Sequence, residues 1–459
     1  MNRCYLKSKR LVFFLYLFLS SSIIAIPSCK CKESDTPVVQ LPKSGKPNVI
    51  LIVADDFGYE LPGYTGGQSY STPNIDFMAA NGMQFTNMFC YPDGFPSRIA
   101  LFTGKYNFRN YIRWGAIKDE EKMLGNLFQG AGYATAYYGK WQFGDGDAGL
   151  KEHGFDEYAV YLPFAEDQRY RRYKNPLVYE NGAYLPDEEV ANSYSEDEFV
   201  SRLTSFIERK VNDSVPFFAV YSLNLIAQPW VPTPDAPAFK LWDYNKDERA
   251  DDIKFLPGMI AYADKKIGEI KDKIYQMGML NNTLFVFTSD NNTDTRINSR
   301  WRGMDVQGAK TTTQFTGNHI PFFAYWPGSI AAGKTNAQLH DFTDLFTTLA
   351  DVVSISTLSY GPLDGVSFYN NMIGLNDDSV RTAVFTDWDN DRKDADAVPM
   401  ERYAYDSVYK LYDVYGERAG KFYNMRNDPN EERPLLESAL TATELSKKAA
   451  LQDIINRLQ

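Results

Sequence analysis

Two pairs of oxygen-bearing side chains, Asp55 with Asp56 and Asp290 with Asn291, form a set suited to binding a metal ion. Each pair directly follows an uninterrupted apolar run, "NVILIVA" in the first case and "TLFVFTS" in the second. Such runs are typical of buried parallel strands, and open α/β sheets bind ligands at the carboxyl ends of their strands. An all-oxygen ligand set suits calcium, or alternatively magnesium, rather than zinc. The sequence therefore predicts a divalent metal site formed by these four residues.

Three cationic side chains lie in segments that contain glycine: Arg98 in "DGFPSR", Lys140 in "GKW" and Lys310 in "VQGAKTTT". A single lysine or arginine is more often exposed to solvent, but a loop after a strand can direct its charge at a ligand. The chain as a whole carries a formal net charge of −11, which speaks against a nucleic-acid partner. An anionic ligand would therefore need a local cluster of cations.

The elements that would position these residues alternate between helices and apolar strands. The alternation predicts an α/β fold with a doubly wound sheet and helices on both of its faces. The expected helices span residues 72–82, 122–130, 195–210 and 255–276, and the strands include "YATAYYG" and "PFFAVYS".

After residue 374 the pattern changes to short strands, "RTAVFTDW", "ERYAYDS", "YKLYDVYG" and "KFYNM", followed by a polar helix from about Thr441. We therefore expect a small C-terminal α+β domain with an antiparallel sheet over residues 375–459.

The N-terminus has the layout of an export signal. Basic residues precede an apolar run over residues 11–26, which is short for a membrane span and contains serines. "IPSC", which ends at Cys29, is similar to the lipid-attachment motif of bacterial lipoproteins. We expect residues 1–29 to be a lipoprotein-type signal, residues 30–46 a spacer, and Cys29 the anchor of an exported periplasmic or cell-surface protein. Any membrane contact would be made through that anchor alone.

Ten segments, in chain order, resemble successive signatures of the sulfatase family within the alkaline phosphatase superfamily. The resemblance extends from about Pro47 to Glu432 and implies a sulfatase-like α/β domain over residues 47–374, with a mixed central sheet. The segments are "PNVILIVADDFGYE", "STPNIDFMAANGMQFTNMF", "PSRIALFTGKY", "GYATAYYGKWQFG", "HGFDEY", "TLFVFTSDNN", "GAKTTTQFTGNHIPFFAYWPG", "FTDLFTTLAD", "LDGVSF" and "KFYNMRNDPNEE".

The resemblance also implies roles for the residues introduced above. Asp55, Asp56, Asp290 and Asn291 would bind the metal, usually calcium. Arg98 would neutralise the region of the nucleophile, and Lys140 and Lys310 would hold the oxygens of a sulfate ester. The implied ligand is a sulfated small molecule or oligosaccharide.

Three positions depart from the family. Its nucleophile is a Cys or Ser in C/S-x-P-S-R that becomes formylglycine, whereas this chain has Gly94 there and no formylglycine is expected. Two histidines that move protons are replaced by Gln142 in "GKWQ" and, on our alignment, by Gln228 in "LNLIAQPWVPTP". A glutamine amide does not titrate near neutral pH and cannot act as a general acid or base.

Two functions remain open. The chain either binds sulfated glycans in a metal-containing pocket with impaired catalysis, or hydrolyses a sulfate or phosphate ester with another nucleophile, such as Asp93 or a metal-bound water. For Cys90, and for the three histidines His153, His319 and His340, packing is the simpler expectation. The aromatic and basic stretch from Asp167 to Gly182 suits either a sugar site or an exposed hairpin.

Overall fold

The computed structural model describes most of the chain beyond the N-terminal segment. The described residues are 45–164, 171–243, 252–375, 380–388 and 401–458. All of them belong to one compact unit. The expected signal, spacer and Cys29 lie outside the described residues, apart from the last two spacer positions. No helix in the described part is both long and apolar enough to cross a membrane.

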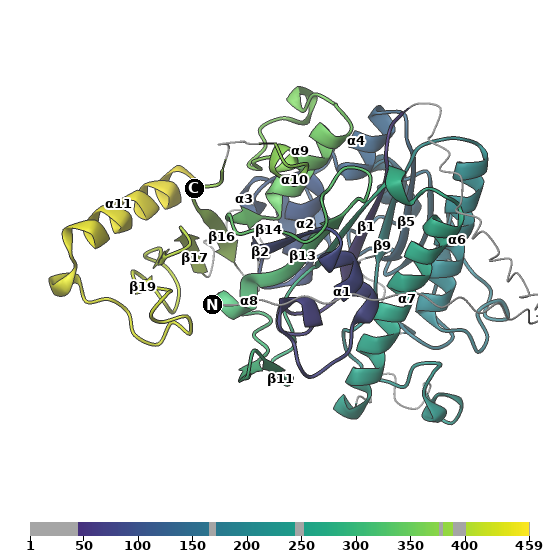
Figure 1. Ribbon diagram of the computed structural model, residues 1–459, viewed down its shortest axis with the longest axis horizontal. Helices are drawn as coiled ribbons and strands as arrows, with labels where there is room; N and C mark the ends of the chain where they lie inside the picture. Colours follow the sequence, from purple (N-terminus) through teal and green to yellow (C-terminus); the bar gives the residue numbers. More distant parts are fainter. Residues whose placement is uncertain (1–44, 165–170, 244–251, 376–379, 389–400, 459) are drawn as a thin grey trace, which may run out of the picture. The chain divides into compact units, whose positions relative to one another are not determined.

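A mixed sheet of eleven strands forms the centre of the fold (Figure 1). Its core is β1 (Asn48–Ala54), which pairs in parallel with β9 (Phe217–Ser222) and β10 (Thr283–Ser289). On the far side of β9, β5 (Ala134–Lys140) and β6 (Glu157–Tyr161) continue the parallel pairing. Next to β10 lies β13 (His319–Tyr325), which is antiparallel to it. The remaining strands of the sheet are β2 (Met83–Phe89), β14 (Lys334–Asn336), β15 (His340–Asp341), β7 (Tyr179–Glu180) and β8 (Ala183–Tyr184).

Helices cover both faces of this sheet, as the doubly wound prediction requires (Figure 1). Alternate side chains of β1 enter two separate cores, so that Val49 belongs to one and Ile50 to the other. The first core is covered by α2 (Gly94–Thr103), α4 (Leu124–Gly130) and α9 (Thr343–Val352). The second is covered by α1 (Pro73–Ala80), α6 (Ser195–Asn212) and α7 (Leu256–Gln276).

A separate antiparallel sheet follows in the C-terminal part, as predicted. It pairs β16 (Val384–Trp388), β17 (Glu401–Tyr405), β18 (Tyr409–Tyr412) and β19 (Phe422–Asn424) in that order. The closing helix α11 (Ala442–Arg457) is capped at its N-terminus by Thr441, whose side chain accepts a hydrogen bond from the backbone N–H of Glu444. The boundary at residue 375 stays a prediction.

The small sheet also fixes a loop of the large one. Lys410 and Tyr412 of β18 both donate hydrogen bonds to the carbonyl oxygen of Thr313, three residues after Lys310. The hydroxyl of Thr313 donates in turn to the carboxylate of Glu401 on β17. Lys410 and Glu401 are buried, so these contacts anchor the loop that carries Lys310.

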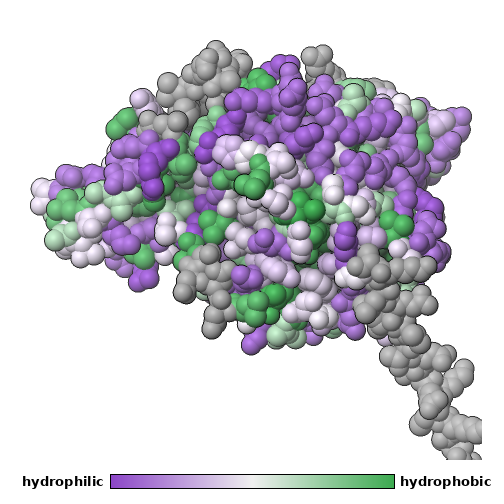
Figure 2. Space-filling view, turned by 90° about the horizontal axis from the view of Figure 1, so that it is seen from above, coloured by the Kyte–Doolittle hydropathy of each residue, from purple (hydrophilic) through white to green (hydrophobic). Residues whose placement is uncertain are grey.

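The molecular surface is mostly polar on the face that Figure 2 shows. Hydrophobic residues form only small patches on this face. Apolar side chains are instead concentrated in the two cores beside the sheet.

Candidate functional site

The carboxyl ends of the parallel strands meet at an open cleft of about 400 Å³. Asp55 and Asp56 follow β1, and Lys140 is the last residue of β5. Asp290 and Asn291 follow β10 and are fully buried next to Asp56. The cleft is lined by Asp55, Asp56, Asp93, Trp114, Lys140, Gln142, Arg172, Ala227, Gln228, Asp294, Thr295, Lys310 and Thr311.

The acidic residues converge on one centre. The ligand atoms of Asp55, Asp56 and Asp290 all lie within 4.8 Å of one another. Neighbouring side chains of an extended strand face opposite sides, but Asp56 has a positive φ of 61°. This departure from the extended backbone lets both adjacent carboxylates reach the same centre.

Two buried oxygen atoms at this centre have no hydrogen-bond partner in the described part of the chain. They are Oδ2 of Asp55 and Oδ1 of Asn291. Buried polar atoms are normally hydrogen-bonded, so both oxygens are available to a cation. Together with the converging carboxylates they form a hard oxygen set, which fits a divalent ion such as calcium or magnesium.

Each carboxylate also contacts a cationic side chain. Lys140 Nζ donates to Asp55 Oδ1 at 2.8 Å and lies 3.5 Å from Asp290 Oδ2. Lys310 Nζ donates to Asp56 Oδ1 at 2.6 Å. Arg98 is fully buried, and its Nε donates to Asp290 Oδ2 at 3.0 Å. The three predicted cations therefore come together with the predicted metal ligands.

The ionisation of the two adjacent carboxyls follows from this arrangement. Burial would raise the pKa of Asp55, but Lys140 and the other nearby cations outweigh it and lower the pKa to about 2. At Asp56 burial prevails over Lys310, and the carboxylates of Asp55 and Asp290 add to it, so the pKa rises to about 6. The described cations thus compensate the negative charge only in part.

Gly94 is the first residue of α2. It holds the position that the family resemblance assigns to the nucleophile. Its backbone N–H donates to the carboxylate of Asp93 at 2.6 Å, which caps the helix. A Cβ built on Gly94 would lie 2.5 Å from Asp290 Oδ2 and 3.1 Å from Asn291 Oδ1. The position therefore faces the acidic centre directly and offers no side chain to it.

The two glutamines also border the cleft. Gln142 is buried, and its Oε1 has no hydrogen-bond partner among the described residues. Gln228 donates through Nε2 to Asp294 Oδ2 at 2.6 Å. Neither amide can exchange a proton with a ligand at neutral pH.

The residues of the cleft that the sequence analysis did not single out include Trp114, Arg172 and Asp294. Arg172 donates to the carbonyl oxygen of Gln228 at 2.8 Å and lies 3.7 Å from Asp55 Oδ2. Its signal was the aromatic and basic stretch from Asp167 to Gly182, of which residues 167–170 lie outside the described residues. Trp114 and Asp294 carried no recognisable signal.

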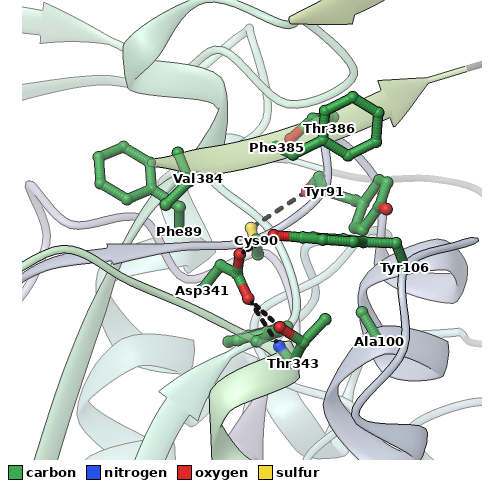
Figure 3. A pocket seen from close by; sticks show the side chains of 11 residues that line it. Phe89, Cys90, Tyr91, Ala100, Tyr106, Asp341, Thr343, Val384, Phe385 and Thr386 are labelled. Carbon is green, nitrogen blue, oxygen red and sulfur yellow. Dashed lines mark hydrogen bonds between the residues drawn. The ribbon is translucent and has the colours of Figure 1, made fainter. Parts of the chain in front are cut away.

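Cys90 lies away from the cleft. It lines a separate cavity of about 10 Å³ beside Tyr91, Tyr106 and Asp341 (Figure 3). Its Sγ donates to the carbonyl oxygen of Tyr91 at 3.1 Å, and burial raises the pKa of the thiol well above its usual value. A neutral, buried thiol is a poor nucleophile, which agrees with packing as its role.

The histidines also have packing environments. His319 is stacked on Tyr59 with ring centroids 3.9 Å apart, and burial lowers its pKa to about 4. His153 lies over Trp141, and His340 contacts Phe85. None of the three lines the cleft.

Comparison with known proteins identifies the family. Residues 47–355 match the family model described as Sulfatase. The chain belongs to the sulfatase family. The N-acetylgalactosamine-6-sulfatase of Canis lupus familiaris is 29% identical over 361 residues, which are 72% of this chain and 66% of that relative. The present sulfatase-family chain thus spans slightly less than two thirds of that relative's length.

Solved structures show the same fold. Ps i-CgsB, in complex with k-i-k-neocarrahexaose, has a TM-score of 0.72 at 23% identity and covers 90% of this chain and 92% of its own. A second protein, in complex with its substrate D-glucosamine-2-N,6-O-disulfate, also has a TM-score of 0.72, at 19% identity, covering 90% of this chain and 98% of its own. The sulfatase fold therefore accounts for nearly the whole described chain.

Proposed function

We propose that this member of the sulfatase family binds sulfated glycans at a calcium-dependent anion site and does not hydrolyse them by the formylglycine route. The observation that carries the proposal is the position of Gly94 at the acidic centre. The family's covalent chemistry needs a side chain there, and a glycine has none. The groups suited to binding charge nevertheless surround this position.

The charges at the cleft support a role for the metal in binding. At and beneath the cleft five carboxylates meet four cations, and a fifth cation, Arg296, pairs with Asp294 at 3.1 Å, so the protein alone has no excess of positive charge for an anion. A divalent ion held by Asp55, Asp56, Asp290 and Asn291 would supply that positive charge to sulfate oxygens. The carboxylates are those of Asp55, Asp56, Asp93, Asp290 and Asp294, and the cations are Arg98, Lys140, Arg172 and Lys310.

The side chains of the cleft would make different contacts with the bound ester. Lys310 and Lys140 would each direct an ammonium group at sulfate oxygens, and Arg172 would add a guanidinium. Gln142 and Gln228 can donate and accept hydrogen bonds but cannot protonate a leaving oxygen. The arrangement supports recognition of the ester more than its cleavage.

The relatives suggest the class of ligand. One is named for its action on N-acetylgalactosamine 6-sulfate linkages, and one solved neighbour is in complex with a sulfated glucosamine. A sulfated hexosamine within a glycan is therefore the ligand that we propose for this cleft.

A second candidate function is ester hydrolysis with Asp93 as the nucleophile. It is favoured by the position of Asp93, which lines the cleft and directly precedes Gly94. Against it, the Asp93 carboxylate already accepts the N–H of Gly94, so attack would disturb the start of α2.

The test uses the purified full chain with calcium and two probes, N-acetylgalactosamine 6-sulfate and D-glucosamine-2-N,6-O-disulfate. Binding is measured by calorimetry and hydrolysis by release of inorganic sulfate. We expect binding that a calcium chelator abolishes, no sulfate release, and loss of binding in Lys310→Ala but not in Lys334→Ala, a control at an exposed position of β14.

The outcomes separate the candidates. Sulfate release that is lost in Asp93→Asn would replace the binding function by the hydrolytic one. Failure of the wild-type chain to bind either probe would refute the proposed function.

For localisation, we propose export with lipid attachment at Cys29, supported by the motif in the sequence. Mass spectrometry of the mature N-terminus tests this directly. A lipidated Cys29 is expected, and an intact Met1 would contradict it.

A further inference from the structure

Trp114 occupies an unusual position at the rim of the cleft. It follows β3 (Tyr111–Arg113), which forms a small hairpin with β4 (Ala116–Ile117). Gly115, with a φ of 80°, permits the tight turn that presents the indole. Trp114 is 45% exposed and lines the cleft that also contains Lys310.

The exposure of this indole sets it apart within the chain. The sequence has seven tryptophans, all in the described part, and the other six are buried or half-buried. Single exposed apolar side chains are common on protein surfaces, but this ring is exposed within a cleft, where a ligand can cover it. Most other side chains that line the cleft are polar or charged.

Packing holds the ring in place from behind. Trp114 contacts Phe95 with ring centroids 5.7 Å apart and planes tilted by 40°. Phe95 is fully buried and directly follows Gly94 in α2. The indole is therefore supported by the same helical turn that borders the proposed sulfate site.

We propose that Trp114 is a stacking platform for the pyranose ring that carries the sulfate group. This inference rests on the proposed function. A pyranose has a face of C–H groups that an indole can cover and a rim of hydroxyls that needs hydrogen-bonding partners. Gln228, Thr295 and Thr311 provide such partners in the same cleft. The platform favours cyclic sulfates over inorganic sulfate, and the partners of the hydroxyls favour sugar sulfates over aryl sulfates, which lack the hydroxyl rim.

The experiment compares three probes on the calcium-loaded full chain: inorganic sulfate, N-acetylgalactosamine 6-sulfate and 4-nitrophenyl sulfate. Dissociation constants are measured for wild type, Trp114→Ala, Trp114→Phe, Lys310→Ala and Tyr275→Ala. Tyr275 is 53% exposed on α7 and does not line the cleft, so it is the matched control for removing an exposed aromatic ring.

We expect Trp114→Ala to weaken binding of the sugar sulfate by about 10-fold or more, because a tryptophan that covers a ligand commonly dominates binding. Inorganic sulfate should bind within about 2-fold of wild type in every variant, because this probe has no ring to stack. Trp114→Phe should retain part of the sugar affinity, and Tyr275→Ala all of it.

Several results would overturn the platform. In one, Trp114→Ala binds the sugar sulfate as tightly as wild type, whereas Lys310→Ala does not bind it. This result would refute the platform and leave the proposed function intact. Another is tighter binding of 4-nitrophenyl sulfate than of the sugar sulfate by wild type. A wild-type chain that binds none of the three probes would refute the proposed function and the platform together.

Discussion

The Oδ2 atom of Asp290 lies 2.5 Å from the point where a Cβ of Gly94 would be. The carboxylate cannot easily move away, because Arg98 contacts that oxygen through Nε at 3.0 Å and Nη2 at 2.9 Å. Asp290 and Arg98 are both fully buried. The acidic centre is thus packed around a glycine. The position lacks a nucleophile, and a side chain added there would also collide with Asp290.

The first prediction concerns the close approach of Gly94 and Asp290. Gly94→Ala should lower the free energy of unfolding by about 1–3 kcal/mol, because the added methyl group must displace a buried, paired carboxylate. Chemical denaturation measures the change.

Gly258 in α7 is the matched control for this substitution. A Cβ there would meet only Thr233 Oγ1 at 4.0 Å, so Gly258→Ala should be neutral or stabilising by up to about 1 kcal/mol. If Gly94→Ala is as stable as wild type, the site has room for a side chain and our account of it is wrong.

The second prediction concerns the metal. Calcium at about 100 times its dissociation constant should raise the free energy of unfolding by about 2.7 kcal/mol, because only the folded chain brings the four ligands together. A calcium titration followed by thermal denaturation measures this increment, and Asp290→Asn should abolish it.

Asp264→Asn tests whether the effect is specific. Asp264 is also a buried carboxylate, but it accepts hydrogen bonds from Asn74 and Ile75 at the start of α1. This variant should be less stable than wild type and keep the full calcium increment. A wild-type chain that neither calcium nor magnesium stabilises would rule out the proposed metal site.

The third prediction concerns the buried ion pair that anchors the loop of Lys310. Lys410 Nζ lies 2.8 Å from Glu431 Oε1, and both side chains are almost fully buried. Lys410→Met should cost about 3–5 kcal/mol of stability, because it leaves the carboxylate buried without its cation. The double variant Lys410→Met/Glu431→Gln should recover part of this loss.

Lys447→Met provides the comparison at the surface. Lys447 pairs with Asp406 at 2.9 Å but is 49% exposed, and its removal should cost less than about 1 kcal/mol. Equal losses in the two single variants, measured by urea denaturation, would show that burial does not determine the strength of these pairs.

The fourth prediction concerns the pH dependence of stability. Glu196 is buried in α6, where it accepts hydrogen bonds from the hydroxyl of Tyr221 at 2.6 Å and the backbone N–H of Asn224 at 2.9 Å. Burial raises its pKa to about 7 despite these bonds, and the nearby carboxylate of Asp197 adds to the shift.

The direction of the change in stability with pH follows from the difference in proton binding between the folded and the unfolded chain. The folded chain holds this proton up to about pH 7, whereas the unfolded chain releases it near the ordinary pKa of a glutamate, 4.5. The stability contributed by Glu196 is therefore complete below pH 4.5 and is lost as the pH rises through 7.

Glu196→Gln should lack this loss. Between pH 4 and pH 8 the stability of the variant relative to wild type should rise by about 3 kcal/mol. Melting temperatures of both proteins across this pH range measure the difference. A difference that does not change with pH would mean that Glu196 is not the titrating group.

Much of the fold could be predicted from the sequence because the signals for its strands and helices lie within short segments of the chain. The apolar runs of β1, β5, β9 and β10 are uninterrupted, and buried parallel strands require this. The Thr-Pro start of α1 and the Thr441 cap of α11 are likewise short-range signals. The alternation of such elements predicted a doubly wound sheet.

The sequence alone also determined which chemical groups are present. It showed the two oxygen pairs after apolar runs, the three cations in segments that contain glycine, and Gly94, Gln142 and Gln228 where the family has a nucleophile and two histidines. These are facts of residue type and order, and no folding can add a side chain to a glycine. The structure places only Lys310 in a loop, because Arg98 lies within α2 and Lys140 ends β5.

Only the tertiary structure decided how these groups meet, because side chains far apart in sequence are brought together by strand pairing. It placed the Asp290 carboxylate in the space beside Gly94, and paired Gln228 with Asp294. It also brought Trp114 from a separate hairpin to the rim of the cleft. Contacts of this kind depend on three-dimensional distance, which has no counterpart in local sequence pattern.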